Sequence, residues 1–97
     1  MTRIRIEVFN LKKLQDGPPM IWEAHRADGV AVYFRYRFGQ WVVYTGDVSI
    51  LSANRQILAE GDSGKGKYDG HCSFSEFCDW ARAAGVDIWP GLTAGTP

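Results

Sequence analysis

The feature that most constrains the fold is a run of β-branched and aromatic residues broken by a single turn. It spans residues 30–45 and reads VAVYFRYRFGQWVVYT. Strand-forming residues on both sides of Gly39-Gln40 predict a β-hairpin with a two-residue loop. Gly39 suits the first central position of a type II′ turn, because glycine adopts the positive φ required there without strain.

The hairpin predicts a sheet with two different faces, because successive side chains of a strand point to opposite sides. One face is expected to join the core and carries Phe34, Tyr36, Phe38, Trp41, Val43 and Thr45. The opposite face carries Tyr33, Arg35, Arg37, Val42 and Tyr44. Arginine and tyrosine next to each other on one face are candidates for a binding surface.

The strand before the hairpin, residues 20–26, can be placed by its turn. A two-residue Asp28-Gly29 turn would bury Glu23 and His25 without partners, at a cost of roughly several kcal/mol. A three-residue loop over residues 27–29, with Gly29 left-handed, shifts the register by one residue. The core-facing pairs are then Met20 with Tyr36, Trp22 with Phe34, and Ala24 with Val32. We expect this longer loop, which places Glu23 across from Tyr33 on the polar face.

The other segments before the helix are less regular. Residues 3–9 alternate strictly and predict a half-buried strand, and residues 11–19 predict a connector because Pro18-Pro19 breaks helix and ladder alike. Residues 47–60 fit neither period; we expect two short strands around residues 53–55, with one helix from Ser49 as the alternative. Residues 61–70 have the composition of a mobile loop.

The clearest helix is predicted over residues 73–84. Ser73 and Glu76 form a capping box, and Cys72 before the cap can pack onto Phe77. Hydrophobic residues recur at helical spacing on one face: Phe74, Phe77, Cys78, Ala81 and Ala84. Gly85 ends the helix, residues 86–89 predict an edge strand, and residues 91–97 are expected to fray.

Length and charge narrow the class of protein. The chain has 97 residues, 11 basic and 11 acidic side chains and a pI of about 6.7. We expect one domain over residues 1–90. The even charge balance argues against nucleic acid as the default partner. A start without an apolar segment, no run long enough to span a bilayer and only two cysteines predict a cytoplasmic protein with reduced thiols.

Two motifs in the glycine-rich segment indicate enzymes but lack the rest of the machinery. Gly61 to Lys67 matches the start of a phosphate-binding loop, but Tyr68 follows where Ser or Thr would hold magnesium, and no helix begins there. The GDSG stretch at residues 61–64 resembles a protease nucleophile segment, yet a chain of this length cannot supply two β-barrels and a triad.

The cysteines and histidines could in principle form a zinc site or a catalytic nucleophile. Cys72 and Cys78 are six residues apart, whereas structural zinc sites use close pairs, and both fit buried positions better. His71 with Cys78 could form a Cys–His nucleophile, but no residue is placed to orient the imidazole. We therefore expect no metal, no cofactor and no enzymatic activity.

The expected fold is α+β: an antiparallel sheet of about four or five strands with one C-terminal helix packed on one face. On the other face lie Glu23, Tyr33, Arg35, Arg37 and Tyr44, which we call the Arg/Tyr face. Its simplest interpretation is a solvated ladder in which arginine stacks on tyrosine and pairs with Glu23. The functional interpretation is a partner-binding site, because Tyr and Arg are enriched at interface hot spots.

Three stretches of the chain resemble small uncharacterised accessory proteins of phages and actinobacterial mobile elements. They are WEAH before Asp28-Gly29, the FRYRFG hairpin at residues 34–39, and Asp69-Gly70 before SFSE. The resemblance implies a host-takeover or anti-defence protein that acts by binding.

We therefore expect a non-enzymatic protein-binding module in the host cytoplasm that docks on a host protein and inhibits it. The alternative is an accessory protein that binds or mimics nucleic acid through Arg35 and Arg37. A homodimer is a further alternative for the partner, and no membrane association is expected.

Overall fold

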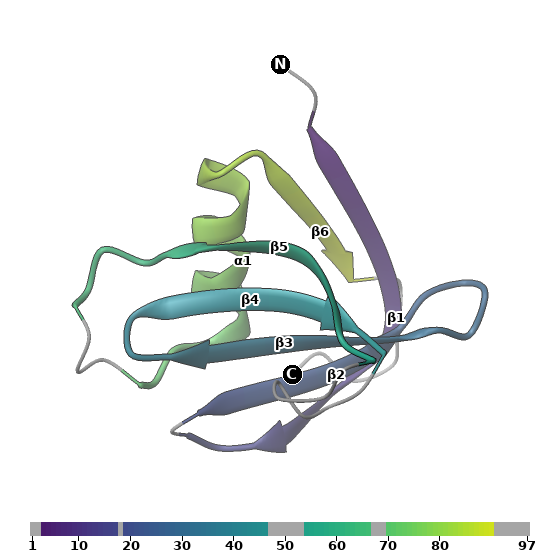
Figure 1. Cartoon of the computed structure of the whole chain (residues 1–97), viewed down its shortest axis with the longest axis horizontal. Helices are drawn as coiled ribbons and strands as arrows, with labels where there is room; N and C mark the ends of the chain where they lie inside the picture. Colours follow the sequence, from purple (N-terminus) through teal and green to yellow (C-terminus); the bar gives the residue numbers. More distant parts are fainter. Residues whose placement is uncertain (1–2, 18, 47–53, 67–69, 91–97) are drawn as a thin grey trace.

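The described part of the chain forms one curved sheet and one helix (Figure 1). The computed structural model describes residues 3–17, 19–46, 54–66 and 70–90. The elements are β1 (Ile4–Gln15), β2 (Met20–His25), β3 (Ala31–Arg37), β4 (Gln40–Thr45), β5 (Gln56–Asp62), α1 (Phe74–Ala83) and β6 (Val86–Pro90). The strand order is β5-β4-β3-β2-β1-β6, with β1 and β6 parallel and the other pairs antiparallel. The predicted α+β class is confirmed, with six strands rather than four or five.

The register of β2 on β3 is the one that burial of polar groups predicted. Trp22 lies opposite Phe34, and Glu23 lies opposite Tyr33. The loop over residues 27–29 is closed by a hydrogen bond that the Arg26 N–H donates to the Val30 carbonyl, and Gly29 has a φ of 89°. The cost of burying an unpaired carboxylate was therefore enough to choose between the two turns.

The β3–β4 hairpin has the predicted faces but a different turn. Its loop is Phe38-Gly39, with φ of 55° and 74°, a pair of positive values typical of a type I′ turn. Tyr36 consequently lies opposite Trp41, a shift of two residues that leaves every strand residue on its predicted side. Phe38, expected in the core, is instead exposed at the tip. Local propensity predicted a positive φ for Gly39 but not for Phe38. In the paired hairpin both residues have a positive φ.

Two segments predicted as loops belong to strands. The expected connector after residue 9 continues as β1 to Gln15, past a bulge at which Asn10 has a φ of 59°. β5 runs into the glycine-rich segment as far as Asp62. In both places a neighbouring strand supplies backbone hydrogen bonds that composition alone does not reveal. Residues 47–53, 67–69 and 91–97 lie outside the described residues, so the predictions made for them stay predictions.

The helix and the last strand follow the sequence pattern closely. Ser73 accepts a hydrogen bond from the Glu76 N–H, and the Glu76 carboxylate accepts one from the Ser73 N–H, which confirms the capping box. Phe77 and Ala81 are buried on the concave side of the sheet. The Phe77 ring contacts the rings of three core residues edge-on: Trp22, Phe34 and Trp41. β6 forms an edge of the sheet, as predicted.

Candidate protein-binding face

Figure 1 shows α1 on one side of the sheet. The Arg/Tyr face is the opposite side, because its residues alternate along the strands with Phe34 and Trp41, which contact Phe77 of α1. Glu23 comes from β2, the next three residues from β3, and Tyr44 from β4. Glu23, Tyr33, Arg35 and Arg37 are half-buried, so each presents part of its side chain to solvent. The structure thus places all five residues on one side of three adjacent strands.

Tyr44 differs from the other four because it has no exposed surface. Its ring packs against that of Tyr33, with centroids 5.5 Å apart and planes tilted by 31°. The expectation that Tyr44 is a surface residue is therefore wrong. Alternation along β4 put it on the correct side of the sheet, but alternation cannot show whether that side is covered. Tyr44 packs beside Tyr33 on the neighbouring strand rather than offering contact area of its own.

Two arginines of this face lack the carboxylate partners that other charged side chains have. Among the described residues, the charged side chains without an ion pair are Arg35, Arg37, Arg55, Glu60 and Asp62. Glu23, expected to pair with this arginine ladder, lies instead 3.5 Å from Lys12. Arg35 and Arg37 are consequently two neighbouring positive charges without a compensating charge beside them.

Both guanidinium groups are also partly removed from water. Burial lowers the pKa of Arg35; the nearby Tyr44 hydroxyl opposes this effect, and the positive charge of Arg37 adds to it. The Arg37 Nε atom is buried and has no hydrogen-bond partner among the described residues. Buried donors without partners are uncommon in folded proteins, because the lost hydration is not replaced.

Phe38 is the functional candidate that the sequence reasoning missed. Its ring is 57% exposed, and the Arg37 guanidinium lies 4.4 Å above the ring centroid. A bulky side chain at positive φ is an uncommon, strained arrangement, and such strain tends to persist at functional sites. Gly39 also suits the second central position of a type I′ turn at Phe38-Gly39. Considering that turn as an alternative to type II′ would have placed Phe38 at the exposed tip.

Next to the arginines, the same side of the sheet carries the unpaired acidic side chains. Val42 lies opposite Glu60, and Gln40 lies opposite Asp62. A shallow cavity of about 270 Å³ opens between these strands. Its lining residues are Gln40, Trp41, Val42, Glu60, Gly61 and Asp62. Two carboxylates at such a cavity favour a cationic group as its occupant.

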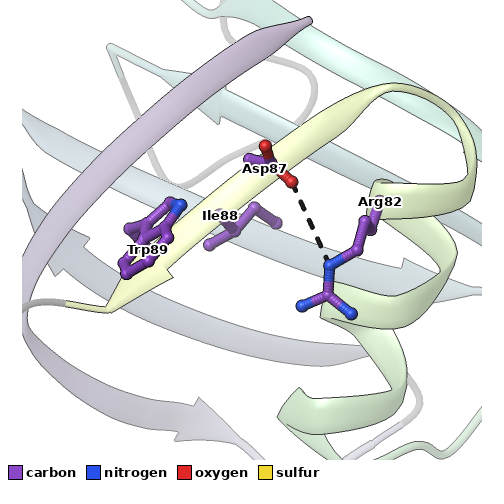
Figure 2. Close-up of a pocket in the computed structure, with 4 residues that line it drawn as sticks. All are labelled: Arg82, Asp87, Ile88 and Trp89. Carbon is purple, nitrogen blue, oxygen red and sulfur yellow. Dashed lines mark ion pairs between the residues drawn. The ribbon is translucent and has the colours of Figure 1, made fainter.

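A second cavity, of about 250 Å³, lies between β6 and the end of α1 (Figure 2). Arg82, Asp87, Ile88 and Trp89 line it. A hydrogen bond from Arg3 holds the pKa of Asp87 below its usual range, and the Arg82 Nε atom lies 4.0 Å from the same carboxylate. Asp87 is therefore ionised near neutral pH and cannot act as a general acid there.

The cysteines do not have the environment of a reactive site. Cys72 is buried, and burial raises the pKa of Cys78 to about 11. A thiol with such a pKa is protonated at neutral pH and is a poor nucleophile. Among residues 3–17, 19–46, 54–66 and 70–90, no three His, Cys, Asp or Glu side chains are grouped so that they could hold a metal ion.

Comparison of the chain with models of known protein families, with curated proteins and with solved structures gave no match. None of the helices in the described part of the chain is long and apolar enough to cross a membrane.

Proposed function

We propose that this protein is a non-enzymatic binding module that docks a protein partner through the Arg/Tyr face. The observation that carries the proposal is the pair of uncompensated guanidinium groups, Arg35 and Arg37, in the middle of the face. Most other described charged side chains are in ion pairs, and Arg35 and Arg37 are two neighbouring positive charges that are not.

The chemistry of the face favours a partner that presents carboxylates. Arginine binds a carboxylate through two parallel hydrogen bonds, and such charge-assisted bonds are stronger than neutral ones. Beside the arginines, Tyr33 and Phe38 offer aromatic surface at a low cost in side-chain entropy. At the edge of this face, the Glu23 carboxylate is in an ion pair with Lys12. The proposed partner is a host protein that the module inhibits by occupying an acidic surface of it.

The test compares capture of proteins from host lysate by wild type and by Arg35→Glu with Arg37→Glu. The double variant removes no core contact, so it should stay folded by circular dichroism. A control with the same change in charge is Arg5→Glu with Lys13→Glu, because both side chains are exposed and lie on β1. We expect one partner to be captured by wild type and control and lost from the double variant. The binding free energy between the purified partner and the double variant should be weaker than that with wild type by at least about 2 kcal/mol.

A salt titration separates this proposal from the nucleic-acid alternative. Affinity for a random 20-base-pair duplex should be weak, because most described basic side chains are already neutralised by carboxylates. Tight duplex binding by wild type, with a steep log–log dependence on salt, would replace the proposal with the alternative. A partner bound equally well by wild type and the double variant would contradict the proposal. The face would then be a solvated ladder without a role in binding.

A further inference from the structure

We infer that the Arg/Tyr face also binds a second copy of this chain, in a symmetric dimer held by reciprocal ion pairs. The inference rests on the proposed function, since it names a partner for the same face. It starts from the five described charged side chains without ion pairs, four of which lie in a regular array on β3 and β5.

The array consists of two rows that cross β3, β4 and β5. In the first row Arg35 lies opposite Val42, which lies opposite Glu60. In the second row Arg37 lies opposite Gln40, which lies opposite Asp62. Each row therefore runs from a positive residue through a neutral one to a negative one. The positive and negative columns are separated by two strand spacings, roughly 10 Å.

This arrangement is self-complementary about a single direction. A two-fold axis that runs parallel to β4 and above the face relates the two copies. It places the positive column of each copy over the negative column of the other. Arg35 then faces the partner's Glu60, Arg37 faces the partner's Asp62, and the same pairs recur in reverse. An axis across the strands would instead place arginine on arginine. An isologous interface requires this kind of reciprocal match, and charge complementarity selects one orientation.

Two local features fit the same geometry. The cavity between β4 and β5 has Glu60 and Asp62 in its lining, so a guanidinium from the second copy would meet two carboxylates there. The axis also brings both hairpin tips, each with an exposed Phe38, to the same end of the dimer.

The dimer should be weak and sensitive to salt. Exposed ion pairs contribute little each and are screened by ions, so we expect a dissociation constant of roughly 10–100 µM at low salt. Raising sodium chloride from 50 to 500 mM should weaken the dimer by about tenfold or more.

Sedimentation velocity on two complementary variants tests the inference. Arg35→Glu with Arg37→Glu makes both columns negative, and Glu60→Lys with Asp62→Lys makes both positive. Each variant alone should be monomeric at concentrations where wild type is dimeric, with dimerisation weakened at least about 100-fold. An equimolar mixture should form a heterodimer, because every facing pair is again of opposite sign. Circular dichroism checks that each variant is folded, and Arg5→Glu with Lys13→Glu should dimerise like wild type.

The outcomes separate this inference from the proposed function. Monomeric wild type at about 200 µM and low salt, or folded variants whose mixture stays monomeric, would overturn the dimer. A dimer that persists in both variants would overturn it as well. The proposed function depends only on the arginines: a partner lost from the arginine variant but retained by the Glu60→Lys, Asp62→Lys variant supports that function even if the dimer fails.

Discussion

Replacing Phe38 by asparagine should stabilise the protein although it removes an aromatic contact. Phe38 has a φ of 55°, and a left-handed conformation costs a non-glycine residue about 1–2 kcal/mol. Asparagine tolerates this conformation and is preferred in type I′ turns. The lost contact with the Arg37 guanidinium, 4.4 Å from the ring centroid, is worth about 0.5–1 kcal/mol at an exposed site. The net expectation is a gain of about 0.5–1 kcal/mol.

Thermal and urea denaturation measure this gain, with Phe38→Ala as the matched control. Alanine removes the same ring but keeps the strain, so its stability should be at or below that of wild type. A gain of this size in a chain of this length raises Tm by about 2–6 °C. Phe38→Asn should at the same time weaken partner binding, because the exposed ring is lost. A Phe38→Asn protein no more stable than Phe38→Ala would refute the assignment of strain to this turn.

Three further predictions concern the core. Phe34→Ala and Tyr44→Ala should each lower the free energy of unfolding by about 3–5 kcal/mol in urea titrations, because neither residue is exposed; a loss below about 1 kcal/mol for Tyr44 would contradict its burial. Gly61→Ala would place a methyl group 2.6 Å from the Trp41 ring and should cost about 1–3 kcal/mol, so an unchanged urea midpoint would contradict that packing. Burial raises the pKa of the Cys78 thiol from its ordinary value of 9.0 to about 11, so stability should fall as pH rises between these values. Urea titration at each pH should show a smaller fall for Cys78→Ala.

The sequence predicted on which side of the sheet each residue of the candidate site lies, but not which of these residues are exposed. Alternation along β3 put Tyr33, Arg35 and Arg37 on one side of the sheet, and the structure keeps them there. Alternation along β4 put Tyr44 beside them without revealing that it is buried. Phe38 was misplaced because a two-residue hairpin loop can move by one position while the strand residues keep their sides.

The ion pair of Glu23 could not be read from the sequence. Glu23 lies across from Tyr33 as predicted, yet its carboxylate pairs with Lys12 on β1. This pairing could not be predicted because residues 11–19 were assigned to a connector, whereas Lys12 lies on β1. The unpaired state of Arg35 and Arg37 is therefore a property of the assembled sheet, as is their alignment with Glu60 and Asp62 on β5.

The sequence by itself determined the elements whose signals are local. The capping box at Ser73, the left-handed glycine at position 29 and the period-two alternation of β3 each act over a few residues, and each is present in the structure. Tertiary structure decided what depends on partners distant in the chain: the extension of β1 to Gln15, the parallel pairing of β6, and the position of the Phe38 turn. Backbone hydrogen bonds and buried contacts between distant segments outweigh weak local preferences, because each satisfied backbone group removes a desolvation cost that no local pattern records.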